Sequence, residues 1–533
     1  MSTSASRSLD QQMTVSPRRL WFILSALMLT LLLAALDQTI VSTALPTITS
    51  DLGGLDELSW VVTAYLLAST ATTPLWGKLS DLYGRKLMLQ SSIVIFLIGS
   101  ALAGLSQNMG QLIGTRAIQG LGAGGLMVLV LAVIADLVPP RERGRYSGLF
   151  GAVFGVASVV GPLLGGLFTQ HLTWRWVFYI NVPLGIAAFV ILGSVLHIAP
   201  RHFRHKIDWI GASLLVLGVV LLLLVTVWGG QRYEWGSMMI IGLTVAGIGS
   251  VVLFIWQELR HPEPIIPLSM FRDPVIRVTS GIGFVVGFAL FGAIVYLSIY
   301  MQVVRGSSPT SAGLQLLPLM VGLLTTSIFS GRMVTRTGKY RIFPIVGTAI
   351  STVGMLMLTQ VGVGTHFWYL AVSTFVLGIG LGCVMQVLLI AVQNSVDPRQ
   401  VGSATSVYTF FRSIGGSFGT ALFGAIWTAQ LAVQLALAAQ SLPPAVAAQL
   451  QGGGTDVTSS LGRIHSLPPD AQQAVLEAIS TAIDRTFMVA VPIMAVSFIM
   501  ALFLKEFPLR THRSVVGEVE ADLDADAGVP LPE

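Results

Sequence analysis

Apolar segments of about 20 residues recur along this chain from residue 20 to residue 505, and this recurrence restricts the possible folds more than any other feature. Each segment is long enough to cross a hydrocarbon layer of about 30 Å as an α-helix. We count about fourteen of them. Because charged residues make up only 10% of the chain, against about 25% in a soluble protein, the sequence predicts an all-α polytopic membrane protein.

The expected helices form a first half of six, an inserted pair and a second half of six. The first half, residues 20–200, should hold helices at 20–45, 58–78, 87–106, 110–137, 146–168 and 175–197. A linker, residues 201–273, should hold two extra helices, at 209–229 and 237–257. The second half, residues 274–505, should hold helices at 276–302, 312–333, 342–362, 367–393, 403–428 and 486–505. We expect an extracytoplasmic loop at 430–484, and a disordered acidic tail within 506–533.

Lys and Arg gather in alternate loops, for example at Lys78, Arg85 and Lys86. By the positive-inside rule, both termini, including residues 1–19, are expected to be cytoplasmic. This sidedness accounts for the net charge of +5, so the charge does not indicate a nucleic-acid partner. The single cysteine, Cys383, lies in an apolar segment, which excludes an intramolecular disulfide and a cysteine metal cluster.

Two loops of the first half recur in the second half in the same order. The polar loop Gly77 to Lys86, with glycines at 77 and 84, has a weaker copy about 254 positions later, at Gly331 to Tyr340. Pro140, Arg141 and Gly144 recur about 258 positions later as Pro398, Arg399 and Gly402. Parallel halves of this kind place a substrate cavity between them near the middle of the bilayer.

These motifs resemble the major facilitator superfamily, and within it the fourteen-helix drug:proton antiporter group, over nearly the whole chain. The resemblance implies the major facilitator fold, with two six-helix halves and two inserted helices. It also implies proton-coupled export of amphipathic small molecules by alternating access. Its signature cytoplasmic gate corresponds here to the residues Gly77, Asp81, Gly84, Arg85 and Lys86.

The gate has a physical explanation beside the resemblance. Gly77 permits close helix approach, and Asp81 can meet the N-terminus of an opposing helix or a basic side chain. Asp136, at the inner end of the fourth helix, is a plausible partner for Arg85. The alternative is that these charges only fix topology. The second copy has Thr335 in place of Asp81, so we expect an asymmetric gate.

Asp37 and Arg116 are the candidate proton-coupling residues. Asp37 lies in a segment, Leu36 to Pro46, that is similar to the family's first-helix signature, although Ser42 replaces the usual Asn. Arg116 resembles the fourth-helix arginine implicated in proton coupling. At 1.5 Å per residue, they lie about 13 Å and about 9 Å from the outer ends of their helices, so both belong to the outer half. The alternatives are an acid that only fixes helix packing, and a static ion pair.

A glycine-rich stretch of the fifth helix resembles the family's antiporter motif, which marks exporters. Its glycines should permit close packing and its proline should bend the helix. The motif residues are Gly155, Gly161, Pro162, Gly165 and Gly166.

Further polar residues in apolar helices are candidates for the substrate cavity. Arg412 lies about 15 Å into its helix, where a lipid-facing charge is unfavourable. The other candidates are as consistent with ordinary interhelical hydrogen bonds; they are Gln38, Tyr65, Asn181, Tyr300, Gln302, Gln386 and Gln393. None of the expected later helices contains a carboxylate, which favours neutral or singly charged substrates.

Other functional classes have less support. The sequence Gly415 to Gly419 satisfies G-x-S-x-G, but it lies inside an expected helix instead of a strand-to-helix turn. There is no Walker A sequence, so the proton gradient is expected to drive transport without a cofactor or metal. We expect a monomer in a bacterial-type plasma membrane, with lipophilic small molecules and protons as partners. The alternatives are a same-fold transporter of a lipid, amino acid or biosynthetic product, a transport-inactive sensor, and an intramembrane enzyme.

Overall fold

The computed structural model describes residues 17–52, 58–138, 140–196, 208–230, 232–397, 400–440 and 468–509. Regular structure in these ranges is helical, apart from one isolated bridge between Gly229 and Tyr233. Twelve helical spans are long and apolar enough to cross a membrane. With α3 (Leu58–Tyr83), which is rich in Ser and Thr, and the shorter apolar α14 (Ile342–Leu358), the described residues hold the fourteen helices that the sequence predicts.

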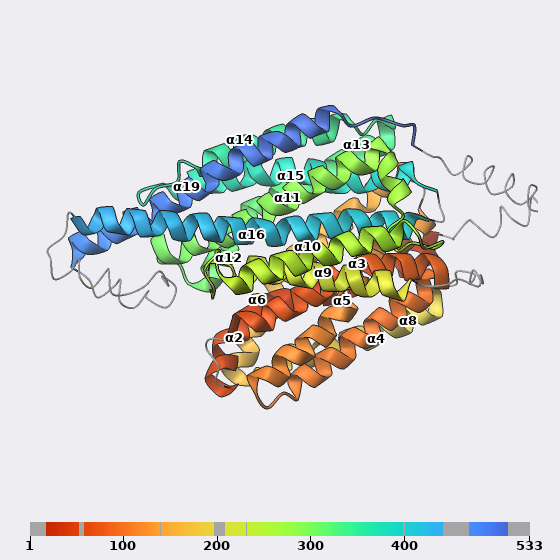
Figure 1. Ribbon diagram of the computed structural model, residues 1–533, viewed down its shortest axis with the longest axis horizontal. Helices are drawn as coiled ribbons and strands as arrows, with labels where there is room; N and C mark the ends of the chain where they lie inside the picture. Colours follow the sequence, from red (N-terminus) through yellow and green to blue (C-terminus); the bar gives the residue numbers. More distant parts are fainter. Residues whose placement is uncertain are drawn as a thin grey trace, which may run out of the picture.

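The first half is a bundle in which α2 packs on α6, and both α3 and α4 pack on α5. Its helices are α2 (Pro17–Leu52), α3, α4 (Arg85–Gly104), α5 (Met109–Leu137), α6 (Pro140–His171), and the broken pair α7 (Trp176–Tyr179) and α8 (Asn181–Val195). Figure 1 shows this bundle in red and orange, next to the green and blue second half.

The second half repeats the arrangement, with α11 on α16 and both α13 and α14 on α15. A short turn, η2 (Leu268–Arg272), precedes it. Its elements are α11 (Pro274–Ile299), the π-helical turn η3 (Tyr300–Val304), α12 (Pro309–Gln315), α13 (Leu317–Thr337), α14, α15 (Phe367–Ser395), α16 (Val401–Gln440) and α19 (Pro469–Leu502).

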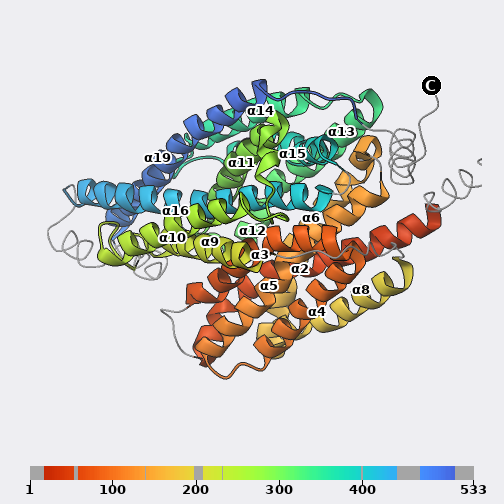
Figure 2. The ribbon, with the colours of Figure 1, turned by 45° about the vertical axis from the view of Figure 1, so that its right-hand side comes forward.

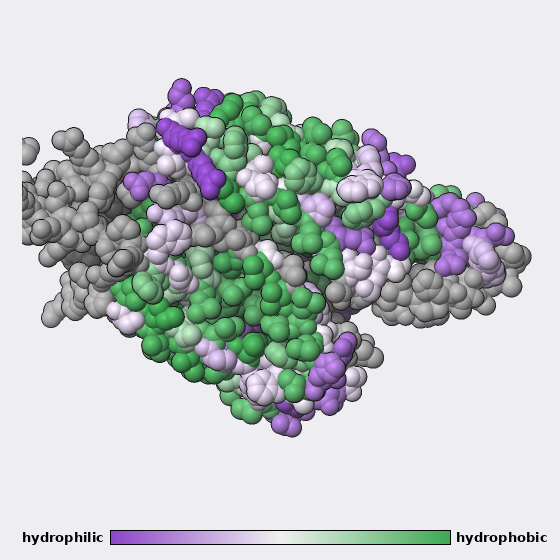
Figure 3. Space-filling model, turned by 180° about the vertical axis from the view of Figure 1, so that it is seen from behind, coloured by the Kyte–Doolittle hydropathy of each residue, from purple (hydrophilic) through white to green (hydrophobic). Residues whose placement is uncertain are grey.

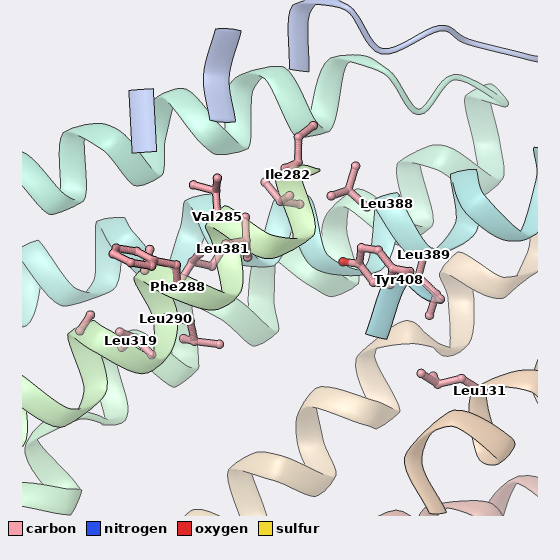
Figure 4. Close-up of a cluster of buried hydrophobic side chains, with 14 of the residues drawn as sticks. Leu131, Ile282, Val285, Phe288, Leu290, Leu319, Leu381, Leu388, Leu389 and Tyr408 are labelled. Atoms are coloured by element: carbon pink, nitrogen blue, oxygen red, sulfur yellow. The ribbon is translucent and has the colours of Figure 1, made fainter. Parts of the chain in front are cut away.

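The halves meet where α13 contacts α6 and where α16 contacts α3 and α5. Buried apolar side chains from both halves belong to one cluster, which includes Leu131 of α5, Leu319 of α13 and Tyr408 of α16 (Figure 4). The inserted helices α9 (Trp209–Trp228) and α10 (Met238–Glu258) pack on each other, and α9 also contacts α3 and α16. Figure 2 shows the inserted pair beside the seam between the halves.

Apolar side chains cover the middle of the surface, while hydrophilic residues gather toward the two ends (Figure 3). Exposed large apolar residues occur on the outer helices of both halves and of the inserted pair, for example Leu87, Ile98, Leu163, Val245 and Ile499. An apolar band between polar ends is what a lipid bilayer stabilises.

The two ends of the bundle differ in charge. One end carries the junctions of α3 with α4 and of α13 with α14, and we call it the basic end because Lys78, Lys86, Arg336 and Lys339 lie there. Gly84 and Gly338, the paired glycines of the sequence repeat, both have positive φ, of 92° and 71°. A backbone of this kind favours glycine, which accounts for the recurrence of glycine at both junctions.

The expected loop at 430–484 is partly helical, which corrects the sequence analysis. α16 continues to Gln440 and α19 begins at Pro469, so both helices extend beyond the expected 403–428 and 486–505. The added turns are rich in Ala, Leu and Gln, which are good helix formers but too polar overall to suggest a membrane span. The longer α19 also brings three carboxylates, Asp470, Glu477 and Asp484, into a later helix, contrary to expectation. In Figure 1, α16 and α19 project together beyond the other helices.

Smaller differences concern breaks within expected helices. The sixth helix is divided at Ile180, and the helix expected at 312–333 is divided at Leu316, before Pro318. Residues 201–207, the acidic tail from residue 510 and the centre of the 430–484 loop lie outside the described residues, as do Pro398 and Arg399.

Candidate functional site

A buried ion pair joins α2 to α5 within the first half. The Arg116 Nη1 atom lies 2.7 Å from Asp37 Oδ2, and the two side chains are 1% and 0% exposed. The sequence analysis placed the two residues at a similar depth, and the structure brings them into direct contact. Because each charge in an apolar interior costs several kcal/mol without a partner, each residue depends on the other.

Two further polar side chains, Gln119 and Asn181, bond directly to the pair. Gln119, one turn after Arg116, accepts a bond from Arg116 Nη1 at 2.6 Å and donates to Asp37 Oδ1 at 2.8 Å. Asn181, expected to line the cavity, also donates to Asp37 Oδ1, at 2.9 Å, and to Ser100 at 3.0 Å. Asp37 therefore accepts bonds from three side chains on α5 and α8. The sequence analysis did not identify Gln119, although it lies only three residues after Arg116.

The remaining surface of Arg116 is also covered. Its Nε donates to the carbonyl of Val61 on α3, and its guanidinium lies 4.2 Å from the ring centre of Tyr65. Tyr65, another cavity candidate, thus stacks on the ion pair, and the Arg116 side chain is almost fully buried in this conformation.

The glycine-rich stretch of α6 packs behind Asp37. A Cβ atom at Gly161 or Gly165 would overlap Thr39 or Thr43 of α2, so these glycines permit close contact between the two helices. Pro162 lies inside α6 between them. Gly166 faces open space, and Gly155 faces Leu324 of α13 in the other half.

Asp81 joins the halves at the basic end. Its carboxylate accepts bonds from the backbone N–H groups of Gly402 and Ser403, at 3.1 and 2.7 Å, and from the Ser403 hydroxyl at 2.7 Å. These N–H groups belong to the first turn of α16, where the helix dipole favours a negative charge. Asp81 therefore caps a helix of the opposite half.

Arg85 holds Asp81 in place from within the first half. It lies 2.6 Å from Asp81 Oδ1 and 2.9 Å from Asp136 Oδ2, and its side chain is 6% exposed. The Arg85 guanidinium thus makes charge-assisted contacts with two carboxylates at once. Lys86 is not part of this cluster, because its Nζ donates to the carbonyl of Gly193 on α8.

Close helix packing accompanies the Asp81 contact. A Cβ atom at Gly77 would overlap Ser406 and the Gly402 carbonyl of α16, and one at Gly402 would overlap Asp81, Arg85 and Gly77. The basic end is therefore closed between α3 and α16 in this conformation.

A second link between the halves involves Gln393, which the sequence analysis placed in the cavity. Arg143 of α6 donates to Gln393 Oε1 at 2.9 Å, and Gln393 donates to Thr405 of α16 at 3.0 Å. Gln393 thus lies at the basic end. The sequence analysis missed this contact, since nothing in the local sequence of Arg143 indicates a partner 250 residues away.

The other cavity candidates do not form one cluster. Tyr300 donates to the Gly362 carbonyl and Gln302 to Ser298, both near the end of the second half that lies opposite the basic end. Gln386 is partly buried on α15, and Gln38 is exposed. Arg412 extends from the middle of α16 to Met127 of α5, with 3.5 Å between Nη2 and the thioether sulfur.

A cavity of about 250 Å³ lies between the inserted helix α9 and both halves. It is lined by apolar side chains and by hydroxyl-bearing Thr63, Thr226, Tyr296, Ser417 and Thr420. Sequence reasoning missed it, because its walls come from α3, α9, α11 and α16.

Comparisons with known proteins place the fold of this chain in a known family. Residues 27–420 match the family described as the Major Facilitator Superfamily. An uncharacterised MFS-type transporter of Mycobacterium tuberculosis is 41% identical over 97% of this chain and 74% of its own length. The multidrug transporter protein MdtP of Bacillus subtilis is 36% identical over 92% and 94% of the two chains. The human organic anion transporter MFSD10 has the same fold, with a TM-score of 0.61 and 15% identity over 91% of this chain and all of its own.

Proposed function

This chain belongs to the major facilitator superfamily and is a transporter, not an enzyme, and from this premise we propose that it exports amphipathic small molecules in exchange for protons. The observation that carries the proposal is the buried contact between Asp37 and Arg116. A paired acid inside a membrane helix is the group that a proton-coupled transporter needs. The relatives named as multidrug transporters support lipophilic compounds as substrates.

Protonation of Asp37 is the proposed coupling step. A proton on the carboxyl removes the charge that Arg116 pairs with, so the ion pair loses most of its attraction. The Oδ1 atom of Asn181 has no partner among the described residues, so its amide can rotate and accept a bond from the new hydroxyl. Arg116 is then held only by neutral groups, and the conformation that requires the ion pair is no longer favoured.

We propose that the contact between Asp81 and α16 is the gate at the basic end, and that it opens and closes during alternating access. The described conformation is closed there, so it corresponds to a state that is occluded or open on the other side. Opening the basic end requires separation of Asp81 from the first turn of α16. We propose that this end is cytoplasmic, that both termini lie on that side of a bacterial-type plasma membrane, and that the monomer is the working unit.

Substrate-dependent proton movement tests the proposal. Proteoliposomes that contain a pH-sensitive dye are exposed to a panel of lipophilic compounds, with native protein and with Asp37→Asn. The native protein is expected to move protons when a transported compound is added, and the variant is not. Proton movement at the native rate in the variant would rule out Asp37 as the coupling acid. A native protein that moves none of the panel would remove the basis for multidrug export.

A second candidate function is export of one dedicated biosynthetic product. The Acurin A biosynthesis cluster MFS-type transporter of Aspergillus aculeatus is 32% identical over 96% of this chain and 94% of its own length. The two functions differ in breadth. Competition among unrelated compounds for uptake into inverted vesicles supports multidrug export, whereas uptake of a single chemical class supports a dedicated exporter.

A further inference from the structure

Arg412 lies in the seam between the two halves, near the middle of the membrane. Arg412 is 11 residues, or about 16 Å of helix, from Val401, which begins α16 at the basic end. Met127 is a similar distance from Leu137, where α5 ends at the basic end. The guanidinium reaches from one half to the other, and the side chain is only partly buried. Its position is thus deep, central and within reach of a molecule between the halves.

No protein counter-ion accompanies this cation in the part of the chain that the structure describes. The four ion pairs present there do not include Arg412. Its one hydrogen-bond contact is the Met127 sulfur, a weak acceptor. Tyr408, one turn earlier on α16, donates its hydroxyl to the Met385 carbonyl and so gives Arg412 no negative charge.

The neighbouring intramembrane charges do not offset Arg412. Asp37 and Arg116 neutralise each other and lie in the outer half of the first bundle. Asp81 and Asp136 are engaged by Arg85 at the basic end. The middle of the seam therefore carries one uncompensated positive charge. Because an unpaired charge in an apolar interior is costly, its complement is expected in the molecule that binds there.

We infer that this transporter selects amphipathic anions, and that Arg412 receives the carboxylate or sulfonate of the substrate between the halves. This inference rests on the proposed export function and specifies its substrate class. Arginine suits the role because its planar guanidinium binds a carboxylate through two parallel hydrogen bonds. Its neighbours Met127 and Gly287 are apolar, which suits the apolar part of an amphipathic molecule.

Three fluorescent probes with the same aromatic group test the inference: dansylglycine is an anion, dansylamide is neutral and dansylcadaverine is a cation. Binding to the purified full chain is measured for the native protein and for Arg412→Gln and Arg412→Lys. We expect the native protein to bind dansylglycine at least about tenfold more tightly than dansylcadaverine, about 1.4 kcal/mol. Arg412→Gln is expected to lose about tenfold affinity for dansylglycine only, and Arg412→Lys to retain part of the preference.

A second pair of variants leaves Arg412 in place. Met127→Glu puts a carboxylate beside the guanidinium, where it acts as an internal competitor for an anionic ligand. It should lower the affinity for dansylglycine as Arg412→Gln does. Met127→Gln, with the same length and no charge, is the matched control and should leave the anion preference intact. The pair keeps the test valid if Arg412→Gln does not fold.

The inference is overturned if the native protein binds the three probes equally, prefers the cation or does not bind dansylglycine. It is also overturned if Met127→Glu keeps the native preference. Failure of the export proposal has a different signature, namely absence of substrate-dependent proton movement while Arg412-dependent binding of dansylglycine persists.

Discussion

At the scale of single residues, two aspartates receive different roles from their neighbours. Asp37 is bound by side chains of its own half and is fully enclosed, so only a proton can change its interactions without moving a helix. Asp81 is bound by backbone groups of the other half, so its contacts depend on how the halves are arranged. The first arrangement suits proton binding, and the second suits control of an opening.

Replacement of Asp81 by Asn should favour opening of the basic end. The neutral amide keeps the shape but loses charge-assisted bonds to α16, which are worth about 1.5–3 kcal/mol each. Spin labels at Tyr83 and Thr337, exposed on opposite halves at this end, report the opening as a longer distance distribution. Cys383, the single native thiol, is replaced by Ser in all samples.

Asp136→Asn is the matched control for this measurement. It removes one carboxylate from Arg85 but leaves the bonds between Asp81 and α16, so we expect a smaller shift. A distance distribution that is the same in native protein and Asp81→Asn would show that Asp81 does not hold the basic end closed. An Asp81→Asn variant in which Asp37 no longer binds a proton would contradict the division of roles.

Asp51, outside the expected membrane span of α2, should make stability depend on pH. A hydrogen bond from Trp174, and next the bond from Arg175, lower the pKa of Asp51 below its ordinary value of 3.8. Because the pKa is lowered on folding, the ionised Asp51 stabilises the folded protein at pH values above 3.8. This stabilisation is lost as the pH falls through the lower pKa of the folded state.

The thermal midpoint of Asp51→Asn should therefore lie slightly below that of the native protein at neutral pH. The effect is small because the Asp51 side chain is 52% exposed. The difference between the two midpoints should shrink as the pH falls below 3.8. A difference that grows in acid would mean that the hydrogen bonds to Trp174 and Arg175 do not favour the carboxylate.

At the scale of elements, the close contact of α3 with α16 depends on the small size of Gly77. Gly77→Val adds atoms where Ser406 and the Gly402 carbonyl already lie, at a cost of about 1–3 kcal/mol to the closed arrangement. The same spin-label pair should report opening of the basic end. Gly166→Ala is the control, since a Cβ there meets nothing within 4 Å. A closed basic end in Gly77→Val would show that another contact holds α3 against α16.

Much of the element pattern could be predicted from the sequence, because apolar length determines which segments span a bilayer. The sequence-based prediction was wrong or incomplete where apolar length does not determine the structure. The ends of α16 and α19 project beyond the membrane-length spans, so helix propensity, not hydropathy, determines where they end. The depth of Asp37 and Arg116 followed from counting residues along helices. The bonds of Asp81 to Ser403 and of Gln393 to Arg143 join distant segments, and only tertiary structure places them.

At the scale of the whole molecule, the proposed coupling pair and the proposed gate occupy different depths. The gate is at the basic end, and Asp37 is 20 residues along α2 from Pro17, about 30 Å away along the helix. The connection between them is the rigid packing of α2, α5 and α6 within the first half, together with the contacts of α3 and α5 with α16. A proton at Asp37 and a bound substrate can therefore bias the same movement of one half against the other.

The most direct test compares two modes of transport in proteoliposomes that contain native protein or Asp37→Asn. In the first mode, an imposed proton gradient drives accumulation of a substrate; in the second, labelled and unlabelled substrate exchange without a gradient. We predict that the variant exchanges substrate but does not accumulate it, because it can move between states but cannot bind a proton at residue 37. Accumulation by Asp37→Asn equal to that of the native protein would contradict the central claim that this acid couples proton movement to export.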